Sequence, residues 1–216
     1  MRISLFLLCV ILSLSASARD TTARAPYNYD GAAFRKGVTI ATLAVGFGND
    51  YRSSYTVPTG FEKGKTSGFA PILARVEYAV SNKVSLAFNA AVGSIYFNSF
   101  RLDSGYNGLI RRSATNKLRL LSGGIAAYYH LGHLFRVDRL DPYIGGGIAL
   151  NNLFYTAFPE GDSTVEKKSH TATPLLKAGV RYYFSDKVSI CAEAGYDRVS
   201  MVSAGFSCRI PGRKKA

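Results

Sequence analysis

The chain has 216 residues, 47% of them hydrophobic and 19% charged, with a formal net charge of +13. This composition excludes a disordered chain, and downstream of the N-terminus no apolar run reaches the ~18 residues of a transmembrane helix. The abundance of Gly, Tyr and Phe favours a β protein with tight turns.

Residues 1–18 are typical of a signal peptide. Arg2 is followed by an apolar run over residues 5–14 and by the small-residue cleavage pattern Ala16-Ser17-Ala18. The alternative, an N-terminal anchor, would need about 20 apolar residues. We therefore expect export and a mature chain beginning at Arg19. Residues 19–36 have no hydrophobic period, which predicts a mobile periplasmic lead-in.

Export decides how the charge and the cysteines are interpreted. An exported basic protein meets acidic lipid headgroups and lipopolysaccharide phosphates rather than nucleic acid, so we expect lipid partners. Export would also permit a disulfide between Cys191 and Cys208. The strand pattern puts the two on opposite faces, so we expect both to be unpaired.

Eight segments downstream have strand character, and together they predict a barrel over residues 37–210 followed by a basic tail, 211–216. Period-two alternation is clearest near the C-terminus, where one face is wholly apolar and the other carries polar residues and glycine. Most segments exceed the 9 to 11 residues of a tilted membrane strand. They lie near 37–48, 69–80, 83–98, 117–131, 141–155, 172–184, 187–197 and 200–210.

The connections between the expected strands alternate in length. Long ones cover residues 49–68, 99–116 and 156–171, and short ones cover 81–82, 132–140 and 185–186. Short turns at one rim and long loops at the other are typical of outer-membrane barrels, and an even strand number puts both termini in the periplasm. The sequence thus predicts an all-β, eight-stranded antiparallel up-and-down transmembrane β-barrel.

Aromatic residues cluster at the ends of the expected strands, which predicts two girdles at headgroup level. The expected periplasmic girdle is Tyr78, Tyr128, Tyr129, Tyr143, Tyr182, Tyr183 and Phe184. The expected outer girdle is Phe47, Phe69, Tyr96, Phe97, Phe154, Tyr155 and Tyr196.

Charged residues stand in mid-strand on the less apolar face. A soluble barrel would bury them in an apolar core, and a lipid-facing Arg or Lys would cost up to about 2–4 kcal/mol near the bilayer midplane. We therefore expect an ion-pair network inside the lumen, with Glu193 between Lys177 and Arg181. An eight-stranded lumen is narrow enough for such side chains to fill it. The predicted network is Arg75, Glu77, Lys177, Arg181 and Glu193.

Two local stretches carry a resemblance to a known family. Residues 141–147 (DPYIGGG) look like the entry to a glycine-rich barrel strand, and residues 203–210 (SAGFSCRI) are similar to the C-terminal signal of barrel assembly, although Ile210 replaces the usual aromatic residue. Over residues 37–210 the chain resembles the small OmpA/OmpX-like outer-membrane barrels. The resemblance implies the outer membrane of a Gram-negative-type bacterium and the barrel-assembly machinery as a partner. It implies no single function.

Three short motifs do not support catalysis or metal binding. Residues 60–66 (GFEKGKT) lack the spacing and the helix of a phosphate-binding loop. His130 and His133 stand three apart on a strand and so face opposite sides. His170 has a serine beside it but no carboxylate placed to orient it. We expect no enzymatic activity, cofactor or metal.

The outer loops are basic, and Arg matches phosphate through paired hydrogen bonds. We expect Arg111, Arg112 and Arg119 to contact lipopolysaccharide phosphates. The leading functional hypothesis is a monomeric barrel with a structural or surface-interaction role. A narrow solute channel and a lipid-A-modifying enzyme remain as alternatives.

Overall fold

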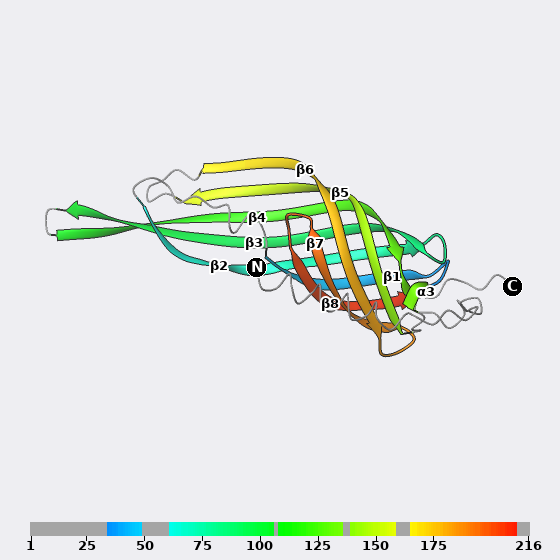
Figure 1. Cartoon of the computed structure of the whole chain (residues 1–216). Helices are drawn as coiled ribbons and strands as arrows, with labels where there is room; N and C mark the ends of the chain where they lie inside the picture. The colour runs from blue at the N-terminus through cyan, green and yellow to red at the C-terminus, as the bar shows by residue number, and fades with distance from the viewer. Residues whose placement is uncertain (1–33, 49–60, 106–107, 136–138, 159–164, 211–216) are drawn as a thin grey trace.

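The computed structural model describes residues 34–48, 61–105, 108–135, 139–158 and 165–210. Eight antiparallel strands close into one barrel in chain order, which confirms the predicted up-and-down fold (Figure 1). None of the helices in these ranges is long and apolar enough to cross a membrane. The elements are β1 (Thr39–Phe47), β2 (Glu62–Ala79), β3 (Val84–Gly105), β4 (Gly108–His130), α3 (Gly132–Phe135), β5 (Leu140–Phe158), β6 (Val165–Tyr183), β7 (Val188–Tyr196) and β8 (Val202–Ile210).

The first and last strands complete the barrel. β1 pairs with β2 and with β8, so that Leu43 lies opposite both Ala74 and Phe206. Where β1 pairs with β8 the barrel has no sheet edge, so the backbone groups of the wall have a neighbouring strand on either side.

The period-two pattern gives the wall two chemically different faces. Side chains at alternate positions are exposed and apolar, and those between them are buried in the bore, which confirms the predicted faces. Cys191 is buried and Cys208 is exposed, and both are free, as expected. Large exposed apolar residues on this wall include Leu43, Val76, Leu86, Phe88, Ile125, Ile144, Ile148, Leu176, Ile190 and Phe206.

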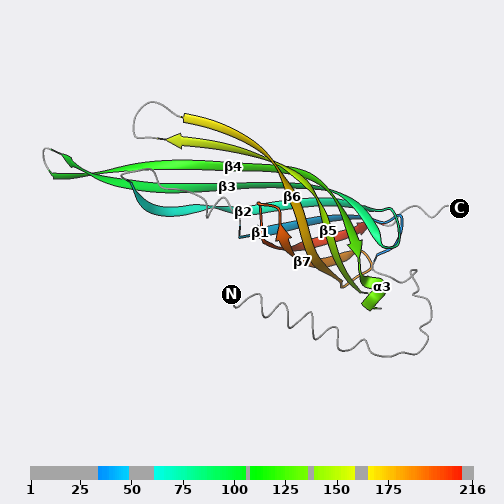
Figure 2. The ribbon, with the colours of Figure 1, turned by 45° about the horizontal axis from the view of Figure 1, so that its top comes forward.

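Five strands are longer than the sequence predicts. The regions 99–116 and 156–171, expected as loops, belong largely to strands: β3 and β4 pair in register from Val84 and Tyr129 out to Gly105 and Gly108. Outside the lipid, a strand needs no apolar face, so the outer halves lack the alternation used to find strands. β1, β7 and β8 have only nine residues each. The outer part of β2–β6 therefore projects beyond the barrel as a curved sheet (Figures 1 and 2).

Gly68 allows β2 to follow β3 into this outer sheet. Its φ is +135°, and a Cβ there would clash with the backbone oxygen of Ser94 and lie 2.9 Å from the Cα of Ile95. Register shifts on either side of it, between Lys63 and Thr66 and between Phe69 and Ile72, mark bulges that bend the strand.

Short turns close the opposite end of the barrel. The Ser81 hydroxyl accepts the backbone N–H of Val84 at 2.9 Å, and the Ser185 hydroxyl accepts that of Val188 at 3.1 Å. Both serines therefore satisfy the backbone of a tight turn locally. β1 begins and β8 ends at this same rim, as the even strand number requires.

The aromatic girdles are only partly as predicted. Tyr78, Tyr129, Tyr182 and Phe184 are exposed at the short-turn rim. Tyr128, Tyr143, Tyr183 and Phe97 are at most 3% exposed and belong to the bore instead. The sequence predicts the position of these four residues along their strands correctly. Side chains alternate between the two faces of a strand, however, and these four fall on the inward face.

The end of the expected lead-in packs against the barrel. Phe34 is 5% exposed and stacks on the His130 ring with centroids 3.4 Å apart. It forms an apolar cluster with Val38, Ile40 and Ala79. The prediction of a mobile segment therefore fails for residue 34, because its ring covers the mouth of the bore at the short-turn rim.

Candidate functional site

The five charged residues predicted for the lumen meet inside the bore. Arg75 and Glu77 come from β2, Lys177 and Arg181 from β6, and Glu193 from β7. All are buried, with exposures between 0% and 7%. All five stand at inward-facing positions, and because the barrel is narrow, side chains from strands on different sides of it meet.

Two of the carboxylates organise this network. Glu77 forms an ion pair with Arg75, whose Nε lies 2.7 Å from a carboxylate oxygen, and pairs also with Arg181. Glu193 pairs with Arg75 and lies 3.9 Å from the Nζ of Lys177. As predicted, Glu193 stands between Lys177 and Arg181 of the neighbouring strand, opposite Gly179. The Arg181 side chain, however, crosses the bore and pairs with Glu77 and Asp141.

Sequence reasoning missed several members of the network. Asp141 accepts from Arg181 at 3.1 Å and lies 2.8 Å from the Nδ1 of His130, and Asp197 pairs with Lys177 at 2.7 Å. Along β5 the apolar outward positions alternate with inward ones, and extending this alternation back to Asp141 would have placed its side chain inside.

Two tyrosines complete the polar layer of the bore. The Tyr128 and Tyr143 hydroxyls accept from the guanidinium of Arg75 at 3.2 and 3.0 Å. Tyr143 also donates to Glu193, and the guanidinium carbon of Arg181 lies 4.3 Å from its ring centroid. The two tyrosines thus lie among the charged side chains and hold them in position.

This layer leaves almost no free space. The cavity found in the described part of the bore has a volume of about 30 Å³, which is enough for one or two waters. It is lined by polar side chains such as Asn89 and Lys177 and by apolar ones such as Leu73 and Leu175. Four carboxylates face three Lys and Arg side chains, and His130 contacts two of those carboxylates. This layer of the bore is a paired polar core, and its cavity has no room for a substrate.

The predicted phosphate contacts do not form one site. The Arg111 side chain lies outside the described residues. Arg112 pairs with Asp103 at 3.1 Å, and Arg101 pairs with the same carboxylate at 2.6 Å. Arg119 lies seven residues further along β4, about 23 Å away at strand spacing. The segment was expected to be a loop, and its extended conformation separates the residues.

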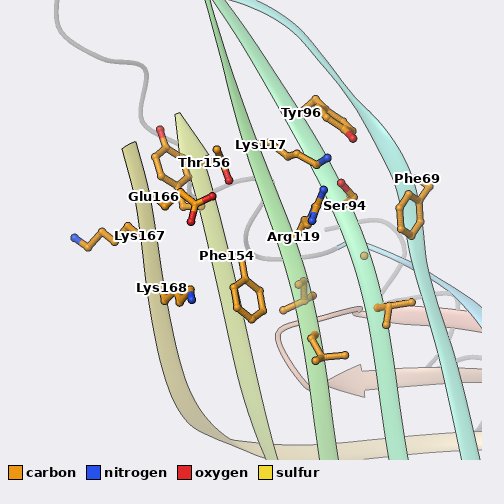
Figure 3. Close-up of a pocket in the computed structure, with 15 residues that line it drawn as sticks. Phe69, Ser94, Tyr96, Lys117, Arg119, Phe154, Thr156, Glu166, Lys167 and Lys168 are labelled. Carbon is orange, nitrogen blue, oxygen red and sulfur yellow. The ribbon is translucent and has the colours of Figure 1, made fainter. Parts of the chain in front are cut away.

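Arg119 belongs instead to a hollow on the outer wall of β3–β6, with a volume of about 530 Å³ (Figure 3). Lys117 and Arg119 of β4 reach toward Tyr96 and Ser94 of β3 (Figure 3). Hydrogen bonds from Lys117 and Ser94 lower the pKa of the Tyr96 hydroxyl, and the Lys117 Nζ lies 5.1 Å from the Tyr96 ring centroid. The hollow combines aromatic walls with cations.

In the described part of the chain, no group of three potential metal ligands gathers around the histidines. His130 is in the bore, whereas His133 is on α3 and is 3.2 Å from the backbone oxygen of His130. His170 is exposed on β6, and its Nδ1 lies 2.5 Å from the Asn152 side-chain oxygen. The partner is an amide and not the carboxylate that orients a catalytic histidine.

Comparisons with known proteins concern the fold alone. No family model and no curated relative matches the sequence. The N-terminal β-barrel domain of Pseudomonas aeruginosa OprF matches at 16% identity and a TM-score of 0.40, covering 82% of this chain and 99% of that one. OprG of the same organism matches at 10% identity and a TM-score of 0.49, covering 83% and 98%. Yersinia pestis Ail, in complex with the heparin analogue sucrose octasulfate, matches at 10% and 0.42, covering 80% and 96%.

Proposed function

We propose that this chain is an integral barrel of the bacterial outer membrane with a structural or surface-interaction role, whose outer sheet and loops contact the outer leaflet, a host surface or a ligand. Its short-turn rim, where the first strand begins and the last strand ends, would then face the periplasm. At the outer surface, Arg and Lys side chains would contact lipopolysaccharide phosphates.

The apolar belt is the observation that carries the proposal. Exposed side chains such as Leu43, Ile125 and Phe206 occur on all sides of the closed wall, at exposures of 61%, 68% and 64%. Soluble monomers rarely expose apolar patches beyond a few hundred Å². A belt around a closed barrel, in which each strand pairs with two neighbours, suits a hydrocarbon surround.

The buried charges support the same orientation of the wall. Arg75, Lys177 and Arg181 all face the bore, where carboxylates neutralise them. In the reverse arrangement each cation would enter lipid at a cost of about 2–4 kcal/mol near the midplane. The distribution of charge thus agrees with lipid outside and a polar core inside.

The filled bore favours a structural or interaction role over a solute channel. The charged layer leaves a cavity of only about 30 Å³, which cannot pass a hydrated solute. Conduction would require the paired groups around Arg75 and Glu77 to separate, and buried charge pairs are expensive to break.

The test combines insertion and conductance. The purified full chain is refolded into lipid vesicles, its electrophoretic migration is compared with and without boiling, and its current is recorded in planar bilayers. We expect a heat-modifiable band in the vesicle fraction and no unitary conductance. Recovery as a water-soluble monomer from the periplasm would overturn the membrane assignment, and steady unitary currents would favour the channel.

A further inference from the structure

Three of the cations that line the outer hollow, Lys117, Arg119 and Lys168, lie in regular rows across the sheet. One row runs through the outward positions Ser94 of β3, Arg119 of β4, Phe154 of β5 and Lys168 of β6. Neighbouring strands are about 4.8 Å apart, so Arg119 and Lys168 stand about 10 Å from each other with the Phe154 ring between them. Figure 3 shows this arrangement on the outer surface of the wall.

The next row toward the projecting sheet consists of Tyr96, Lys117, Thr156 and Glu166. Rows on one face are two residues, or about 7 Å, apart. Lys117 and Arg119 therefore form an adjacent pair of cations on β4, with the single carboxylate, Glu166, two strands away. The hollow has a positive balance on the β4 side.

On β3 and β4 the apolar belt ends directly below these rows, whereas on β5 and β6 the next outward pair is Asn152 and His170. On β3 and β4 the next outward positions toward the short-turn rim are Val92 and Leu121, exposed by 42% and 48%, and these two lie opposite each other. Both also line the hollow. The site thus has an apolar floor at the upper limit of the belt and cations immediately above it.

We propose that this hollow binds a phosphorylated glycolipid of the outer leaflet, with Lys117, Arg119 and Lys168 holding its phosphates and with Val92, Leu121 and Phe154 against its acyl chains. The inference rests on the proposed membrane function and deepens it. A phosphate accepts charge-assisted hydrogen bonds from Arg and Lys, and an acyl chain continues along the belt. The separation of about 10 Å between Arg119 and Lys168 suits two anionic groups on one headgroup.

The depth of the site favours a lipid over a free anion. Inorganic phosphate would use the cations but gain nothing from the apolar floor, whereas a lipid whose chains are in the bilayer presents its headgroup at this height. Phe69 and Tyr96 also line the hollow, and aromatic rings favour the headgroup region.

The test is equilibrium binding to the full-length folded barrel in detergent, measured by native mass spectrometry. The probes are bisphosphorylated lipid A, the same lipid without phosphates, phosphatidylglycerol and inorganic phosphate. The site variant is the triple substitution Lys117→Gln, Arg119→Gln and Lys168→Gln. Its control, Lys83→Gln, Arg139→Gln and Lys187→Gln, removes the same three charges from exposed positions at the short-turn rim.

We expect the site variant to lose at least about tenfold in affinity for bisphosphorylated lipid A, with no change in the control. Lipid A without phosphates should bind the unmodified protein as weakly as the site variant binds the phosphorylated form. Equal affinities of the two variants, or indifference to the lipid phosphates, would overturn the inference. So would equally tight binding of phosphatidylglycerol, or displacement of lipid A by equimolar inorganic phosphate.

Failure of this inference is distinguishable from failure of the proposed function. Heat-modifiable migration reports whether each variant forms the barrel, independently of any lipid. A barrel that inserts but shows no phosphate-dependent contrast would overturn only the lipid site.

Discussion

The bore of the barrel and the outer sheet of β2–β6 both carry cations and carboxylates, but they differ in burial. In the bore, Glu77 and Arg181 are fully buried and mutually paired. In the outer sheet, Asp103 is 29% exposed and its partner Arg112 is 48% exposed. Burial makes an unpaired charge expensive, whereas solvent screens an exposed one. The same residue types should therefore determine stability inside and partner binding outside.

The largest expected effect comes from removing a charge inside the bore. Glu77→Gln leaves Arg75 and Arg181 without their shared carboxylate, and we expect the free energy of unfolding in vesicles to fall by about 3–5 kcal/mol. The matched control is Glu166→Gln, which removes an exposed carboxylate from β6. A loss of less than 1 kcal/mol for Glu77→Gln, as measured by urea titration, would contradict the comparison.

Removal of the ring at the mouth of the bore should have the next largest effect. Phe34→Ala abolishes the stacking on His130, and we expect a loss of about 3 kcal/mol, at the low end for a buried Phe. Leu134→Ala, at a residue 57% exposed on α3, serves as the control. If Phe34→Ala unfolds at the same urea concentration as its control, the ring does not seal the barrel.

Two glycines in paired strands test how closely the wall is packed. A Cβ on Gly147 would clash with the backbone oxygen of Ile125 and lie 2.6 Å from the Cα of Ala126, whereas a Cβ on Gly123 meets nothing within 4 Å. We expect Gly147→Ala to cost about 1–3 kcal/mol and Gly123→Ala to change stability by less than about 0.5 kcal/mol. Equal unfolding midpoints would show that the wall can relax around the methyl group.

The smallest effect is expected in the outer sheet. Asp103→Asn removes the carboxylate shared by Arg101 and Arg112, and we expect a loss below about 1 kcal/mol, because exposed ion pairs are screened. Thermal unfolding in vesicles measures the shift. A loss comparable to that of Glu77→Gln would remove the distinction between the two regions.

The sequence predicts the wall better than the outer sheet, and lipid explains why. Between Val188 and Ile210 one face must be apolar, so alternation reveals strand, parity and orientation together. Beyond the belt neither face has to be apolar. The hairpin around residues 99–116 therefore shows no alternation of apolar and polar residues, although its backbone is paired throughout the described part. Register across several strands is also not local information, so the row that joins Arg119 to Lys168 could not be predicted.

Within the bore, the residues could be predicted but their partners could not. Inward parity identifies Arg75, Glu77 and Arg181. Which carboxylate each cation reaches depends on the diameter of the bore and on side-chain rotamers, and Arg181 crosses to β2 instead of using Glu193. Tyr143 was assigned to the girdle by its position near a strand end, and Asp141 was assigned no role. The alternation of inward and outward positions along β5 would have placed both in the bore.

Both proposals for this barrel require the exposed apolar face of the wall to touch lipid, and site-directed spin labelling along β8 tests this directly. Nitroxides are placed one at a time at positions 203, 204, 206, 207 and 208 of the barrel in vesicles. Cys191 is replaced by Ser in every variant, and Cys208 is replaced by Ser in all variants except the one labelled at position 208. Positions 204, 206 and 208 should collide with dissolved oxygen and be protected from a water-soluble nickel reagent, whereas 203 and 207 should be protected from both. Ready collision of the nickel reagent with positions 204 and 206 would show that this face of the wall is in water and not in lipid.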